Sequence, residues 1–85
     1  MDYWNNQVAS RNSIFYVKLT KAEKLVFERI IKGFTTAAIA SDLGKNPRTI
    51  SNQIGSVYRK FDVGNNPHLS PRVELIRKWY KLDSL

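Results

Sequence analysis

The side chains best suited to chemistry lie in the stretch KNPRTISNQIGSVYRK, which runs from Lys45 to Lys60. At about 100° per residue, the apolar members of this stretch gather on one side of a helical wheel. The opposite side carries Arg48, Asn52, Gly55 and Arg59, with Ser51 and Ser56 at its flanks. An asparagine amide can bind adenine through two hydrogen bonds, an arginine can bind guanine or phosphate, and short side chains let the backbone approach a base edge. The face therefore predicts hydrogen bonding to the bases and phosphates of a nucleic acid.

We expect bases and phosphates to be contacted from different positions of this stretch. The groups that suit base edges are Ser51, Asn52, Gly55 and Arg48. The groups that suit the phosphates flanking a groove are Lys45, Thr49, Arg59 and Lys60. Phosphate contacts add affinity without sequence information, whereas base contacts discriminate between sequences.

No set of residues predicts catalysis, metal binding or a membrane segment. The chain has 85 residues, no cysteine and one histidine, His68, which we interpret as an exposed loop residue. A chain of this length folds as one small domain with little room for a large pocket. Without a nucleophile–base set or a metal-ligand cluster, we expect no enzymatic activity, no cofactor and no metal site. No window approaches the roughly 18 apolar residues that span a bilayer, and the N-terminus does not resemble a signal peptide, so we expect a cytoplasmic protein.

The charge of the chain is positive and unevenly distributed. Its formal net charge is +7, and most of the excess lies in residues 44–81. The basic side chains of that part are Lys45, Arg48, Arg59, Lys60, Arg72, Arg77, Lys78 and Lys81, against Asp62 and Glu74. A basic half suggests a polyanionic partner, most often nucleic acid, and a generic solubilising surface is the alternative.

Local signals predict an all-α domain of four helices, at about 21–32, 36–43, 47–61 and 71–82. Thr20 and Glu23 form a capping box at the start of the first helix. Asn46 is a preferred N-cap for the third helix, with Pro47 at its first position. The apolar side of that helix is Ile50, Ile54, Val57 and Phe61. Because the second and third helices meet through a short turn around Gly44, we predict a helix-turn-helix.

Residues 1–18 form an N-terminal extension, and the helical domain occupies residues 19–85. The end of the extension, SIFYVKL from Ser13 to Leu19, favours strand conformation. Because a lone strand has no sheet to join, we interpret it as an extended strap packed over the helical core. The alternative is that residues 13–17 are a contact surface for a partner protein or a second subunit.

The last helix carries more apolar surface than docking on one core requires. One stripe, Val73, Ile76 and Tyr80, is sufficient to dock on the core. The second stripe, Leu75, Trp79 and Leu82, lies about 120° away and predicts an interface between two copies. The alternative is that Trp79 folds back under residues 13–17.

An ordered set of residues gives the chain a family resemblance. The set is LTKAE at 19–23, Val26 and Phe27, Ile30, Gly33, Ile39 and Ala40, Leu43, Thr49 and Ile50, Ile54, YRKFDV at 58–63 and RVELI at 72–76. It is similar to the LuxR/GerE-type helix-turn-helix of bacterial transcription regulators. The resemblance implies a four-helix domain whose third helix reads the major groove and whose fourth helix pairs two copies on a two-fold site. By position, Ser51, Asn52 and Gly55 match the groove-facing residues of the family.

The chain also departs from the family pattern at a few positions. Ala38 replaces a glutamate of the second helix, Ser51 replaces a lysine, and Gln53 replaces a histidine. The loop after Val63 is about six residues longer than that of the family.

The leading hypothesis is a transcription regulator that binds double-stranded DNA as a homodimer, with residues 47–61 in the major groove. The alternative is a protein-interaction module of the same fold, which would bind and modulate another regulator through residues 13–17 or the last helix. The sparse charge at Ser51 and Gly55, the apolar extension and an exposed Trp79 would favour this alternative. Promoter recognition of the sigma-factor type shares the fold, but no polymerase-binding segment is visible. The Met-Asp opening fits a complete small regulator slightly better than a fragment.

Overall fold

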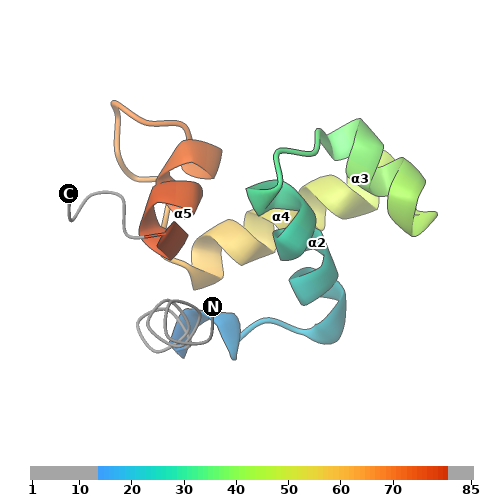
Figure 1. Ribbon diagram of the computed structural model, residues 1–85, viewed down its shortest axis with the longest axis horizontal. Helices are drawn as coiled ribbons and strands as arrows, with labels where there is room; N and C mark the ends of the chain where they lie inside the picture. The colour runs from blue at the N-terminus through green and yellow to red at the C-terminus, as the bar shows by residue number, and fades with distance from the viewer. Residues whose placement is uncertain (1–13, 81–85) are drawn as a thin grey trace.

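The computed structural model describes residues 14–80, and these residues are helical with connecting turns (Figure 1). A helical turn at residues 14–16 precedes four helices. The helices are α2 (Lys21–Ile31), α3 (Thr36–Leu43), α4 (Pro47–Lys60) and α5 (Pro71–Tyr80). The four-helix prediction is confirmed, with bounds within one residue for the first three helices. The part of the fourth prediction that covers residues 81–82 lies outside the described residues.

Local capping explains where the helices begin and end. Thr20 and Glu23 form the predicted capping box, in which each side chain accepts a hydrogen bond from the other's backbone N–H. The other end of α2 closes with Gly33 at φ +92°, which a glycine adopts without strain. Asn46 caps α4 by accepting a hydrogen bond from the Arg48 N–H at 2.8 Å.

The turn between α3 and α4 depends on Gly44. This residue has φ +65°, in the left-handed region, and the next N–H, from Lys45, donates to the Ala40 carbonyl at 2.9 Å. The chain therefore reverses within a few residues, and α4 starts at a fixed angle to α3. The predicted helix-turn-helix is confirmed.

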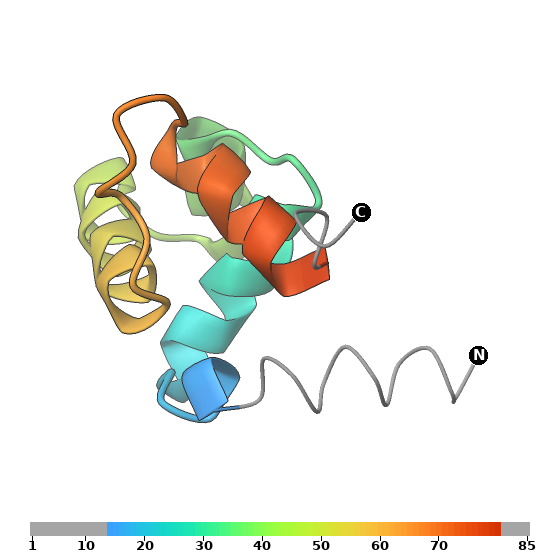
Figure 2. The ribbon, with the colours of Figure 1, turned by 90° about the vertical axis from the view of Figure 1, so that its left-hand side faces the viewer.

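The core lies between α4 and the other three helices, α2, α3 and α5. Its fully buried side chains are Phe27, Phe61, Ile30, Ile39, Ile50, Leu75, Val26 and Val57. The predicted apolar side of α4, which also includes Ile54, is thus confirmed. Figure 2 shows α4 along one side of the molecule, with the other helices against its inner surface. One face of α4 is consequently buried and the opposite face is open.

The segment before α2 is not an extended strap. Residues 14–16 form a helical turn, and the Leu19 N–H donates to the Tyr16 carbonyl at 3.0 Å. The predicted packing over the core is nevertheless present, since the Phe15 ring stacks on Phe61 with centroids 5.5 Å apart. Strand-favouring residues form a turn here because none of the residues 14–80 forms a strand that could pair with them, whereas a turn satisfies part of the backbone locally. The Ser13 end of this prediction lies outside the described residues.

The rotation of α5 differs from the predicted one, although Ile76 and Tyr80 of the predicted docking stripe are half-buried. Leu75 was predicted to face a second copy, but it is fully buried in the core. The indole of Trp79 packs edge-on against Phe27 with centroids 4.9 Å apart and lies 5.8 Å from the Tyr16 ring. Val73, predicted to dock on the core, is 42% exposed.

Aromatic neighbours explain this rotation. Tyr16, Phe27 and Phe61 surround the indole of Trp79, and an indole buries more apolar surface there than a valine would. The alternative that Trp79 folds back under residues 13–17 is therefore correct, as its contact with Tyr16 shows. Leu82, the third predicted interface residue, lies outside the described residues.

None of the helices in residues 14–80 combines the length and the apolar character that a membrane crossing requires.

Candidate nucleic-acid interface

The open face of α4 carries the side chains that were predicted to contact bases. Arg48, Ser51 and Asn52 are exposed, and Gly55 is half-buried between them and Arg59. These positions lie opposite the buried Ile50 and its neighbours on the same helix. The buried and open sides of α4 therefore agree with those predicted from the helical repeat of the sequence. The structure brings the four predicted base-contact positions together on one surface.

The predicted phosphate positions flank this surface at both ends, with one exception. Lys45 and Thr49 are exposed near the start of α4, and Arg59 is exposed in its last turn. The chain contains no acidic residue between Leu43 and Phe61. Neither α4 nor the turn before it therefore presents a carboxylate that would repel phosphate.

The exception is Lys60, whose ammonium points inward. Its Nζ donates to the Glu23 Oε1 at 2.7 Å, and only 32% of its side chain is exposed. In the free protein, Lys60 thus forms an internal ion pair with α2, and its contact with phosphate stays a prediction. Ser56, placed on the flank of the open face by the wheel, also turns inward and donates to Glu23 Oε2. The open face is narrower than the sequence suggested.

Glu23 remains ionised in its buried site because three groups hydrogen-bond to it. Burial alone would raise the pKa of this carboxyl. Hydrogen bonds from Lys60, Ser56 and the Thr20 backbone, together with the charge of Lys60, outweigh burial and lower the pKa from 4.5 to about 2. Glu23 is the one buried charged residue in the described part of the chain.

Sequence reasoning assigned Glu23 to the cap of α2 and missed its contacts with α4. The contact between Glu23 and Lys60 could have been predicted only if the packing of α2 against α4 had been known. Nothing in the spacing of Glu23 and Lys60 indicates that they meet.

Gly55 occupies the middle of the open face without an internal reason for being glycine. A Cβ added there would meet only the Arg59 Nη1 at 3.6 Å, an ordinary contact. Its φ is not among the positive values of the chain, so the backbone does not require glycine either. In a helix interior, glycine is less favourable than alanine by about 0.5–1 kcal/mol. What the glycine provides is bare backbone on the outer surface.

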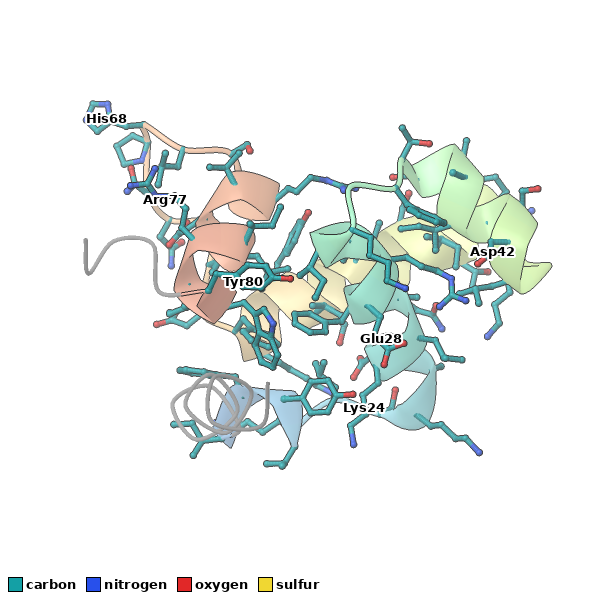
Figure 3. The ribbon with its side chains drawn as sticks, in the orientation of Figure 1. Lys24, Glu28, Asp42, His68, Arg77 and Tyr80 are labelled. Carbon is teal, nitrogen blue, oxygen red and sulfur yellow. The ribbon has the colours of Figure 1, made fainter. Side chains whose placement is uncertain are left out.

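The helix that precedes the turn is fixed to α2 by an ion pair. Arg29 donates from Nε to Asp42 Oδ2 at 2.5 Å and from Nη1 to the Leu25 carbonyl at 2.9 Å. Asp42 lies on α3, beside α2 (Figure 3). This pair neutralises the carboxylate closest in sequence to the turn.

The remaining predicted polar residue, His68, lies apart from this surface. It is exposed in the loop between α4 and α5 and points away from the helices (Figure 3), as expected for a loop residue. Among residues 14–80, no three His, Cys, Asp or Glu side chains gather as metal ligands would.

Comparison with known proteins places this surface in a family context. Residues 17–73 match the family model described as bacterial regulatory proteins, LuxR family. The chain is also similar to the transcriptional regulatory protein YdfI of Bacillus subtilis (strain 168), with 42% identity over 48 residues. That alignment covers 56% of this chain and 22% of the relative, so the chain corresponds to less than a quarter of that protein's length. No solved structure matches the chain.

Proposed function

Because this chain belongs to the LuxR family of bacterial regulatory proteins, we propose that it regulates transcription by binding double-stranded DNA with α4 in the major groove. The observation that carries the proposal is the open face of α4: it has no acidic residue, it is formed by short or hydrogen-bonding side chains, and the opposite side of the helix is buried. A major groove is wide enough for one α-helix, and such a face lets the helix enter deeply. The similarity to a transcriptional regulatory protein agrees with this role.

We assign base contacts to Arg48, Ser51, Asn52 and Gly55. Asn52 is exposed on the open side of α4 and can make two hydrogen bonds to one base, which makes it the main source of discrimination. We assign phosphate contacts to Lys45, Thr49 and Arg59, which are exposed near the two ends of the helix.

The test compares Asn52→Ala with Arg59→Ala on a duplex selected from a random pool and on random duplex. Asn52→Ala should lower affinity for the selected duplex by about 1–3 kcal/mol and leave affinity for random duplex unchanged. Arg59→Ala should weaken both complexes alike and make the salt dependence shallower by about one unit of slope. Asn65→Ala, in the exposed loop before α5, is the matched control. An Asn52→Ala variant that keeps the full preference for the selected duplex contradicts the assignment.

The proposed active form is a homodimer paired through α5. Since Leu75 is buried and Trp79 packs on the core, the available apolar surface of this helix is the stripe predicted to dock: Val73, which is 42% exposed, and the half-buried Ile76. Pairing along this stripe would present two α4 helices to two half-sites one helical turn apart.

A second candidate function is protein binding, and one observation favours it. Ile14 and Val17 are 61% and 68% exposed at the turn before α2, although both are large apolar residues. A gel shift with random duplex at about 50 mM salt separates the two candidates, because a basic DNA-binding domain retains nonspecific affinity at low salt. Absence of any shift would favour the protein-interaction module.

A further inference from the structure

One carboxylate joins the start of α2 to two positions of α4. Glu23 Oε1 accepts hydrogen bonds from the Thr20 N–H at 2.8 Å and from the Lys60 ammonium at 2.7 Å. Its Oε2 accepts from the Ser56 hydroxyl at 2.5 Å. The residue itself is 7% exposed, so these bonds are largely shielded from water. Both oxygens of a buried anion are therefore committed to fixed partners.

The two α4 partners lie one helical turn apart on the same side of the helix. Ser56 and Lys60 are four residues apart, and residues with that spacing lie one above the other. This side is adjacent to the open face, about 40–80° away from Asn52 around the axis by the helical repeat. The same two hydrogen bonds therefore hold α4 at an angle that determines where the open face points.

Packing of the buried apolar side limits the rotation of α4, and directional hydrogen bonds restrict it further. The attraction between the core residues is non-directional. A rotation of α4 by about 20° would move side-chain atoms at its surface, about 6 Å from the axis, by about 2 Å. Such a displacement would break hydrogen bonds of this length.

We propose that Glu23 is a positioning residue for base reading, which sets the rotation of α4 about its own axis through Ser56 and Lys60. The inference rests on the proposed DNA-binding function and extends it to a residue on another helix. Lys60 then contributes to specificity from inside the protein, without contacting phosphate. Glu23 would be required for discrimination between sequences more than for attraction to DNA.

The variants Glu23→Gln, Lys60→Met and Ser56→Ala weaken the network in different ways, since Gln loses the charge and one acceptor oxygen whereas Met and Ala each lose a donor. Gln at position 23 still suits the capping box, so α2 keeps its start. Met at position 60 keeps the apolar stem of the lysine and removes its charge. Lys32→Met is the matched control, because Lys32 is exposed at the other end of α2 and lies outside the binding face. All variants are compared at a temperature at which each is fully folded.

The expected result is a loss of preference rather than a loss of binding. Lys60→Met should lower the affinity ratio of selected to random duplex by about tenfold, with a salt slope equal to that of Lys32→Met. Glu23→Gln should lower the same ratio, and the double variant should lose no more than either single variant, since both disrupt one network. If Lys60 instead contacts phosphate, both affinities fall together and the slope becomes shallower by about one unit, which overturns the proposal.

Residual dipolar couplings of the free protein provide a readout that does not depend on DNA. The orientation of α4 relative to α2 should change in Glu23→Gln and Ser56→Ala and stay as in the parent in Lys32→Met. An unchanged orientation, or an unchanged affinity ratio, overturns the positioning role. If the parent protein prefers no duplex over random sequence, the proposed function fails by itself, and the couplings still decide whether Glu23 orients α4.

Discussion

Gly55 is a position at which the needs of the fold and of the interface differ. Because no contact among residues 14–80 requires glycine there, Gly55→Ala should raise the free energy of unfolding by about 0.5–1 kcal/mol. The added methyl group would stand between the helix backbone and the bases, so affinity for the selected duplex should fall. Urea unfolding and duplex titration of the same sample measure the two effects. A variant that is more stable and binds DNA as well as the parent would show that the backbone does not approach the bases.

The stability of the protein in acid should depend on Glu23. Its pKa is lowered from 4.5 to about 2 in the folded state, so the unfolded chain binds the proton more readily. The stabilisation is thus fully present above about pH 4.5 and is lost as the pH falls toward 2. The shift corresponds to about 3 kcal/mol. Urea unfolding of the parent and of Glu23→Gln between about pH 6 and pH 2 should show a steeper loss for the parent, and parallel profiles would contradict the pKa shift.

The open face of α4 could be predicted from the sequence, but the partners at its edge could not. The positions of Arg48 and Asn52 on that face follow from the helical repeat alone. The inward turn of Lys60 depends on Glu23, which is 37 residues away in the chain and reaches it only after α2 and α4 have packed. Nothing in the sequence around Lys60 indicates that its ammonium pairs with a buried carboxylate on another helix.

At the scale of elements, helix starts were predictable because their signals are local. Thr20 and Asn46 each cap a helix within three residues, and both predicted caps are present. The rotation of α5 was not predictable in this way, since both of its stripes are apolar and either could face the core. The rotation of α5 is set by the aromatic rings of Phe27 and Phe61, against which the indole of Trp79 packs.

The turn before α2 should contribute to stability through its aromatic residues. The Phe15 ring stacks on Phe61, and the ammonium of Lys78 lies 5.1 Å from the centre of the Phe15 ring. Phe15→Ala should therefore lower the free energy of unfolding by about 1–3 kcal/mol. Ile14→Ala, at an exposed position of the same turn, should change it by no more than about 0.5 kcal/mol. Equal effects of the two substitutions would mean that the turn is not docked in solution.

At the scale of the whole molecule, the oligomeric state tests the corrected rotation of α5. If two copies pair along the exposed stripe, Val73→Glu should shift the protein toward monomer and reduce affinity for a two-fold site far more than affinity for a half-site. Sedimentation equilibrium over a range of concentrations measures the first effect. Trp79→Ala should instead destabilise the fold, because its indole packs against Phe27. A dimer that survives Val73→Glu unchanged would exclude this stripe as the pairing surface.

The division of α4 into an open face and an inward pair also bears on how its target could be changed. Target preference should be transferable by exchanging only the residues of the open face, such as Asn52 and Gly55, for those of another regulator. If Glu23 positions α4 as proposed, Ser56 and Lys60 should be left in place, because their hydrogen bonds to Glu23 hold the helix. A graft that replaced the whole helix would also replace Ser56 and Lys60 with side chains that do not match Glu23. The new base-contacting residues would then face DNA at the wrong rotation of the helix.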